Sequence, residues 1–445
     1  MAAKGELFEL QIARLLVAEG AFVRRRVNLE PSGRQVTDLD VLAFLFDETL
    51  RLRLATGECK TAEAKSAPSS KDRLLWLAGV NQLVGADDGF LATMRNARDE
   101  DREVARSLNL EIIEPRALER RERIALPEAM TAHSEAALAI ERQVDTACGK
   151  DDELKRVYQF VRSELWLAPP VAALKRALGA MRILGSRWSP SLGEAQQVVL
   201  RWLFAELLCG FVIAAVRLAG ESYRTPEDVF AKRLNERLAE GLASYDSMRE
   251  IAKQVDRFMV GVLREAGVGE TEVVGAIGAL APRPPAYAEP LLELIQRFAA
   301  EPRLARQVPR LAERYAASEY PSEEPEAARL LRLVAAFVER QGRVPADLVT
   351  PLRWRSGVDS SSDAGDSTHS AKSGDPSGSG DSKDSADSHD SSHPGESDST
   401  DSRRAPATTV SKNKAVRKSE TPEAKAIGDT ASASSASVEI PLFRE

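Results

Sequence analysis

The chain has 445 residues, which is enough for two or three domains, and its formal net charge is −7. Its three cysteines, Cys59, Cys148 and Cys209, lie far apart in the sequence, which argues against a disulfide framework and a cysteine-rich zinc site. The first residues do not show the charged-then-apolar pattern of a signal peptide. We therefore expect a cytoplasmic protein that is not associated with a membrane.

The N-terminal part alternates helical and strand-like patterns in an order typical of an α/β fold. A helix is expected over residues 5–20, ending at Gly20, and two apolar strand-like runs follow over 36–46 and 50–60. The remaining elements are a helix over 71–84, a strand over 89–93, a helix over 99–108 and a strand over 110–113. This pattern predicts a domain with a central mixed sheet over residues 1–125.

Both strand-like runs carry acidic residues, which are unfavourable in strands and are usually solvated or functional there. Side chains alternate between the two faces of a strand, so Asp38 shares a face with Asp40, and Glu58 shares a face with Lys60. If the runs form a hairpin around residues 47–49, Glu58 lies opposite Asp38 or Asp40, with Cβ atoms roughly 5 Å apart. A register slip of one residue, or a bulge, would separate these groups.

Carboxylates that converge at this spacing repel each other unless a cation lies between them. Because no His or Cys cluster accompanies them in the sequence, the preferred ion is Mg²⁺ or Mn²⁺ rather than Zn²⁺. Such an ion activates water and stabilises charge on a phosphoryl group. Lys60 lies two residues beyond Glu58 on the same face, where its ammonium group is placed to steady the attacking water. The pattern therefore predicts a metal site that cuts phosphodiesters.

Asp40 and the sequence Glu-Cys-Lys over residues 58–60 resemble the PD-(D/E)xK nuclease superfamily, with its restriction-endonuclease-like fold. The likeness is strongest to Mrr-type restriction enzymes and archaeal Holliday-junction resolvases, and it covers roughly residues 4–115. It implies a DNA endonuclease in which Asp40 and Glu58 hold the metal, Lys60 positions water and Glu9, in the opening helix, assists. Asn81 and Gln82 lie where some of these enzymes use a polar residue. Restriction, repair and junction processing all fit, and RNA as the substrate stays open.

A catalytically inactive protein is the main alternative, because a bare Glu-x-Lys triplet also occurs at 63–65 and 423–425. Such a protein would keep the nuclease fold to bind nucleic acid, or would act as an adaptor through a helical interaction domain. Binding to DNA requires a local cationic surface. The candidates for contacts with DNA are Arg24, Arg25, Arg26, Arg34, Lys65, Lys71 and Gln82, and each is equally compatible with an ordinary solvated surface.

From residue 127 to 350 the apolar residues recur with the period of a helix, which predicts an all-α domain over 127–350. Its most apolar segment, 202–216, includes Glu206 and is shorter than the roughly 20 residues that span a bilayer, so we expect a buried helix. This domain carries no catalytic motif. It is a candidate surface for DNA, for a protein partner or for a second subunit, and a homodimer is compatible with cutting both strands.

Residues 355–437 have almost nothing apolar to bury and are expected to be disordered. Their first part is rich in Ser and Asp, with 11 acids and two lysines over 359–402, and a weakly basic linker follows. This acidity predicts competition with nucleic acid for a basic groove. The last residues, 438–445, are apolar again. Such an end is typical of a peptide that docks on a protein partner, or of a segment that folds back onto the chain's own body.

Overall fold

The computed structural model describes residues 4–30, 34–61, 69–125, 131–240, 283–319 and 324–352, together with several residues between 254 and 266. The tail expected over 355–437, the terminal peptide 438–445 and Lys65 lie outside the described residues. The described residues belong to one compact unit. A five-stranded sheet forms its N-terminal part and helices follow, in agreement with the expected layout.

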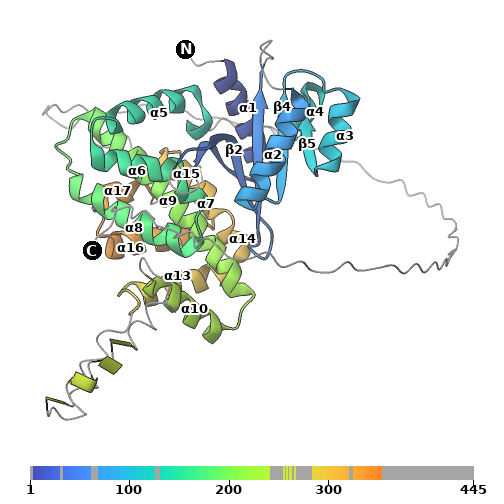
Figure 1. Cartoon of the computed structure of the whole chain (residues 1–445). Coiled ribbons are helices and arrows are strands. Elements are labelled where there is room, and N and C mark those ends of the chain that lie inside the picture. Colours follow the sequence, from blue (N-terminus) through green and yellow to red (C-terminus); the bar gives the residue numbers. More distant parts are fainter. Residues whose placement is uncertain are drawn as a thin grey trace, which may run out of the picture. The chain divides into compact units, whose positions relative to one another are not determined.

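The N-terminal part follows the alternation of helices and strands that the sequence predicts, with one additional strand, β1, that was not predicted from the sequence (Figure 1). Its helices are α1 (Lys4–Ala18), α2 (Ser70–Val84), α3 (Asp99–Ser107) and α4 (Pro115–Ala125). Its strands are β1 (Phe22–Leu29), β2 (Thr37–Phe46), β3 (Leu52–Lys60), β4 (Asp88–Thr93) and β5 (Leu110–Ile113). Local signals set the ends of α2, which begins with a capping box between Ser69 and Asp72 and ends at Gly85, whose φ is 67°.

The strands form one sheet in the order β1-β2-β3-β4-β5. The first three strands are antiparallel, whereas β3, β4 and β5 are parallel to each other, so the sheet is mixed. The β2–β3 hairpin turns at Asp47, whose carboxylate accepts hydrogen bonds from the backbone N–H groups of Thr49 and Arg51. The register pairs Val41 with Gly57. It therefore places the next residues outward along the hairpin, at positions 40 and 58, opposite each other.

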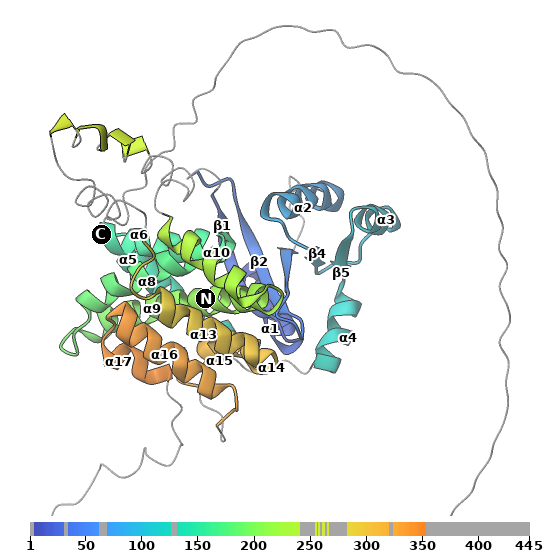
Figure 2. The same cartoon turned by 90° about the horizontal axis from the view of Figure 1, so that it is seen from below.

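Helices cover both faces of this sheet (Figure 2). On one face lie α1 and α4, where Ile12 and Leu118 share a core cluster with Phe90 of β4. On the other face lie α2 and α3, where Leu77 of α2 shares a cluster with Leu91, the next residue of the same strand. Because neighbouring side chains of a strand point to opposite sides, one strand supplies both layers of the core.

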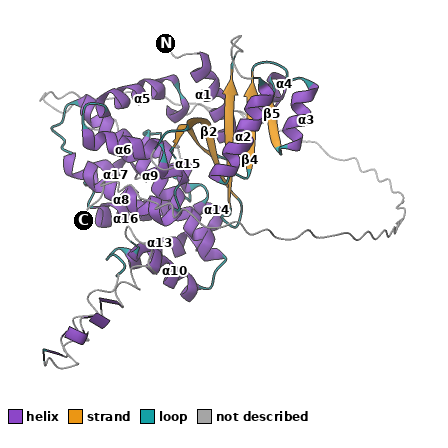
Figure 3. Ribbon diagram, in the orientation of Figure 1, coloured by secondary structure: helices purple, strands orange, loops and turns teal. Residues whose placement is uncertain are grey.

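The described residues after α4 form mainly helices, as expected (Figure 3). These are the 3₁₀ helix η2 (Thr131–His133), α5 (Glu135–Cys148), α6 (Asp152–Arg162), α7 (Glu164–Leu167), α8 (Pro170–Arg187), α9 (Glu194–Tyr223), α10 (Glu227–Ala239), α13 (Ala288–Ala300), α14 (Pro302–Ala305), α15 (Val308–Ala316), α16 (Ala328–Gly342), α17 (Ala346–Val349) and the 3₁₀ helix η3 (Thr350–Leu352).

The centre of the helical part is α9, which is buried over most of its length between Val199 and Gly220. Around it pack α5, α8, α13 and α15. Among the described helices, α9 is long and apolar enough to cross a membrane, but 72% of its most apolar window is buried inside the protein. A helix that is apolar all round and enclosed by other helices is a core helix, as the sequence predicts.

The helical part packs against the edge strand β1 and covers it. Arg24 of β1 forms ion pairs with Glu206 of α9 and Glu313 of α15. Phe22 of the same strand packs against Trp166 of α7, with ring centroids 5.9 Å apart. The sheet and the helices therefore share one hydrophobic core across the expected division near residues 125–127.

Candidate functional site

The structure brings Asp40, Glu58 and Lys60 together at the open end of the β2–β3 hairpin. Lys60 Nζ lies 2.6 Å from Glu58 Oε1 and 3.9 Å from Asp40 Oδ2. Asp40 Oδ2 also accepts a hydrogen bond from the backbone N–H of Cys59 at 2.7 Å, which fixes the direction of this carboxylate. The hairpin thus holds two carboxylates beside one ammonium group, at the positions that the parity of the strands predicts.

Arg73 of α2 joins this cluster, although no sequence pattern singled it out. Its Nη1 lies 3.0 Å from Glu58 Oε1, the same oxygen that Lys60 contacts. The capping box at Ser69 fixes the start of α2, so that the first turn presents Arg73 to β3. Its Nε is buried and has no hydrogen-bond partner among the described residues. The N-terminal end of α2 therefore adds a cation, and the positive end of a helix dipole, to the site.

Glu58 is buried and Asp40 is half-buried, and this burial changes how readily the two carboxyl groups ionise. Burial raises the pKa of Asp40, while the hydrogen bond from Cys59 and the charge of Lys60 oppose that rise. Burial also raises the pKa of Glu58; the negative charge of Asp40 adds to this rise, and Lys60 and Arg73 oppose it. Two carboxylates that interact in this way gain from a further cation, because it favours the ionised form of both.

Glu9 lies in a neighbouring cluster, where α1 meets β1. Arg26 donates hydrogen bonds to Glu9 and to Glu6, each at 2.9 Å. Burial raises the pKa of Glu9 and the charge of Asp40 adds to that rise, so the two carboxyl groups interact electrostatically. The β1–β2 register sets Arg26 beside Asp40, and its φ is 54°, in the left-handed region that a non-glycine residue seldom adopts. Strained residues of this kind cluster at functional sites.

The donor set suits a hard divalent cation. Proteins bind Mg²⁺ through one or two carboxylates, with water and substrate phosphates completing its coordination. Within the described part of the chain, no group of three His, Cys, Asp or Glu side chains is arranged to hold a metal. Asp40 and Glu58 therefore fit one Mg²⁺ or Mn²⁺ ion held by two carboxylates.

The cationic surface near this site is smaller than the sequence suggests. Arg24 and Arg25 are buried, with exposed fractions of 8% and 5%, and both are ion-paired in the interior. They are therefore not available to a nucleic-acid backbone. Arg26 is half-buried against its two glutamates, whereas Arg34 and Lys71 are exposed.

Gln82 does not join the site. It is exposed and lies nine residues after Arg73 along α2, which is roughly 14 Å by helical rise. The preceding residue, Asn81, faces the sheet instead and accepts a hydrogen bond from Thr56 of β3. Of the two neighbouring amides that the sequence pattern indicated, Asn81 rather than Gln82 therefore belongs to the sheet face of α2.

Comparisons with known proteins leave the family open. No family model and no curated protein matches the chain. A solved crystal structure of a protein of unknown function, AF1548, is similar over 45% of this chain and 95% of its own length, with 14% sequence identity and a TM-score of 0.22. A likeness at this level identifies neither a fold nor an activity.

Proposed function

We propose that the chain is a metal-dependent endonuclease that hydrolyses phosphodiester bonds of DNA, with Mg²⁺ or Mn²⁺ as its cofactor. One observation supports this most: the half-buried carboxylate of Asp40 and the buried carboxylate of Glu58 lie beside Lys60 at the end of a strand hairpin. The same set of two acids and a lysine underlies the resemblance of the sequence to PD-(D/E)xK nucleases.

In this proposal Asp40 and Glu58 hold the metal, which when bound supplies an activated water and charge stabilisation at the phosphoryl group. Lys60 is the most accessible of the three, with 39% of its side chain exposed, so its ammonium group reaches the attacking water or a phosphate oxygen. The backbone N–H of Cys59 keeps the Asp40 carboxylate in place. Each residue therefore has one task that its position supports.

Arg73 contributes a phosphate contact in this proposal. In the structure it neutralises Glu58 together with Lys60. When a divalent cation takes over that task, the guanidinium group is free to bind a phosphate oxygen, and its buried Nε is a further donor. Lys71, exposed in the same turn of α2, extends the cationic surface along the DNA backbone.

A second function, nucleic-acid binding without cleavage, is favoured by the same ion pairs. Glu58 Oε1 contacts both Lys60 and Arg73, so its charge is balanced by the protein's own cations. A protein that keeps this arrangement would present cations to a nucleic acid and would not hydrolyse it. Its affinity for DNA would then be the same with and without a divalent ion.

Nicking of supercoiled plasmid separates these two functions. The wild-type chain is expected to nick DNA in Mg²⁺ or Mn²⁺ and to stop in EDTA. Asp40→Asn and Lys60→Ala should each lower the rate by about 100-fold or more, because each removes a group that stabilises the transition state. Asp38→Asn is the matched control, since Asp38 is an exposed carboxylate two residues away on the same strand.

Cutting that persists in EDTA, or an Asp40→Asn variant as active as the Asp38→Asn control, would contradict the nuclease proposal. A gel-shift titration of the same proteins with a short duplex reports binding separately. A wild-type chain that shifts the duplex but does not nick plasmid in either metal would support binding without cleavage.

A further inference from the structure

A groove of about 660 Å³ lies among α5, the first turn of α6, the end of α8 and the start of α9. Its surface is mainly apolar and is formed by Ala147, Leu154, Leu192, Ala195, Val199 and Leu200. Leu154 and Leu192 are half-buried and Ala195 is exposed, so the groove opens to solvent. Pockets that enclose small ligands range from roughly 300 to 1,000 Å³, so this groove has room for several apolar side chains of a peptide.

Polar side chains form the rim of this groove. Gln143, Lys150 and Gln196 line it and are exposed. The two glutamine amides can donate and accept hydrogen bonds, as the backbone of an extended peptide requires. Lys150 has no carboxylate within ion-pairing distance among the described residues, whereas Arg187 on the same rim pairs with Asp151. The rim therefore suits an extended peptide that carries an acidic residue.

The chain itself contains a peptide of this kind beyond Leu352, the last described residue. Residues 359–402 contain no Val, Ile, Leu, Met, Phe, Trp or Tyr, whereas half of residues 438–445 are Val, Ile, Leu or Phe. Pro441 restricts the preceding Ile440 to extended backbone, and side chains two apart on extended backbone point to the same side. Ile440 and Leu442 are therefore expected to enter the groove together, with Glu439 near the ammonium group of Lys150.

The connection between the folded part and this peptide is long enough to reach the groove. As a flexible coil, the 85 residues from 353 to 437 have a root-mean-square span of roughly 50 Å. A folded body of about 350 residues has a radius of gyration of roughly 20 Å. The peptide therefore reaches any face of the protein, at an effective concentration on the order of 1 mM, which keeps even a weakly binding peptide in place.

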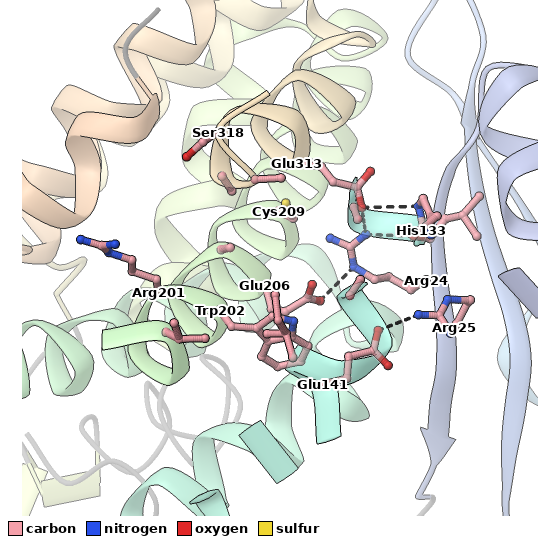
Figure 4. A pocket seen from close by; sticks show the side chains of 18 of the residues that line it. Arg24, Arg25, His133, Glu141, Arg201, Trp202, Glu206, Cys209, Glu313 and Ser318 are labelled. Atoms are coloured by element: carbon pink, nitrogen blue, oxygen red, sulfur yellow. Dashed lines mark hydrogen bonds and ion pairs between the residues drawn. The ribbon is translucent and has the colours of Figure 1, made fainter. Parts of the chain in front are cut away.

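Two other cavities suit such a peptide less well. The cavity of about 280 Å³ between β1 and the helices α5, α9 and α15 is lined by the ion pairs of Arg24 and Arg25 with glutamates (Figure 4). Apolar side chains in this cavity would desolvate those charges further without giving them a partner. The other cavity, of about 560 Å³, is lined by Arg306, Arg310 and Arg314, so it favours an anion over apolar side chains.

We propose that residues 438–445 of the same chain dock in the groove between α5 and the start of α9. Docking closes residues 353–437 into a loop and keeps the 11 acids of residues 359–402 close to the folded part. The inference does not depend on the proposed nuclease activity, because the groove contains none of the residues of the Asp40 cluster.

Photo-crosslinking of the full chain tests this inference. Benzoylphenylalanine in place of Phe443 keeps an aromatic side chain, and irradiation should link it to residues 143–154 or 192–200 of the same molecule, as identified by mass spectrometry. The same analogue in place of Val410, between the acidic stretch and the peptide, is the control and should not link to these residues.

A substitution in the groove makes this test specific. Ala195→Glu places a carboxylate on the groove surface, at an exposed position in the first turn of α9 where an acidic residue is compatible with the helix dipole. It should lower the yield of the link at least tenfold. Ala336→Glu, at an exposed position of α16 outside the groove, is the matched control and should leave the yield unchanged.

A labelled synthetic peptide with the sequence of residues 438–445 gives a second measure, by fluorescence anisotropy. In the wild type the chain's own segment competes with it, so the peptide should bind the full chain carrying Leu442→Asp and Phe443→Asp at least tenfold tighter than the wild type. Adding Ala195→Glu to that variant should abolish binding.

Four outcomes would overturn the inference. They are a link from position 443 to another part of the chain, a link to a second copy that doubles the mass, a yield that Ala195→Glu does not lower, and equal affinity of the peptide for the wild type and the double variant.

Discussion

Arg24 is a buried cation whose removal tests how the sheet and the helices are held together. Its guanidinium group pairs with Glu206 at 2.9 Å and with Glu313 at 2.5 Å. It also lies over the rings of Phe22 and Trp166, with Cζ 4.1 and 4.8 Å from the ring centroids. Burial acts to lower the pKa of Arg24, but the two glutamates raise it above the ordinary value, so the group stays charged.

The substitution Arg24→Met keeps much of the side-chain volume and removes the charge. Removing one partner of a buried ion pair costs roughly 3–5 kcal/mol, because the remaining charge is left uncompensated. The loss of the desolvated cation–π contacts adds up to about 2 kcal/mol, and protonation of a stranded carboxylate offsets part of the total. We therefore expect the free energy of unfolding to fall by about 3–5 kcal/mol at neutral pH.

A triple variant distinguishes the loss of the ion-pair attraction from the cost of leaving buried carboxylates unpaired. Arg24→Met combined with Glu206→Leu and Glu313→Leu leaves no unpaired charge inside. Replacing a complete buried ion-pair network by apolar residues is often neutral or stabilising, so the triple variant should lie within about 2 kcal/mol of the wild type.

The deficit of the single variant should also depend on pH. Burial raises the pKa of Glu206 and of Glu313, and Arg24 opposes both rises, so both pKa values increase further without it. A carboxyl group whose pKa is raised by folding contributes stability below its unfolded pKa of about 4.3, and this stability is lost as pH rises through the folded value. The Arg24→Met variant should therefore approach the wild type as pH falls from about 7 to about 4.5.

Guanidinium unfolding, followed by tryptophan fluorescence and by circular dichroism, measures these differences. Arg53→Met is the control, because Arg53 forms an exposed pair with Asp88 and such pairs contribute about 1 kcal/mol or less. The reasoning is refuted if Arg24→Met is no more destabilising than Arg53→Met. It is refuted equally if the triple variant is as unstable as the single variant.

Two further predictions concern stability. Because burial and the nearby arginines lower the pKa of His133, the contribution of this residue to stability should fall as pH drops below about 6.5, by at most about 1.4 kcal/mol per pH unit, and His133→Gln, measured by unfolding at about pH 7.5 and 5.5, should lose less stability than the wild type. A larger loss in the variant would contradict this. Gly220→Ala should destabilise the chain by about 1–3 kcal/mol, because the added Cβ would lie 2.3 Å from the carbonyl oxygen of Leu50. The control Gly79→Ala, in α2 with open space around it, should stabilise by about 0.5–1 kcal/mol, and equal thermal shifts for the two variants would count against the argument.

The alternation of strand residues was enough to predict the core of the candidate site. Asp40 and Glu58 face each other because the turn at Asp47 sets the hairpin register, and both the turn and the parity are local properties. The apolar run within α9 likewise contains its own signal for a buried helix. Local periodicity therefore predicted the strands of the hairpin and the buried helix, but it did not predict β1.

What the sequence could not show depends on contacts between distant segments. Arg24 and Arg25 look like the start of a basic surface, yet the partners of Arg24 lie 182 and 289 residues away and the partner of Arg25 lies 116 residues away. Arg73 reaches Glu58 because of how α2 docks on β3, which no local pattern specifies. A basic residue in the first turn of the helix after the Glu-Cys-Lys strand was the available signal, and it becomes informative once that docking is known.

The closure of β1 by helices has a consequence for how the protein can be divided. A fragment that ended at residue 125 would leave the hydrogen-bonding edge of β1 open, and such edges recruit strands from other molecules. The fragment would also leave the guanidinium groups of Arg24 and Arg25 without their counter-ions. Trimming the chain to its sheet would thus expose an edge that helices cover in the full protein. Measurements on such a fragment would report self-association rather than the properties of Asp40 and Glu58.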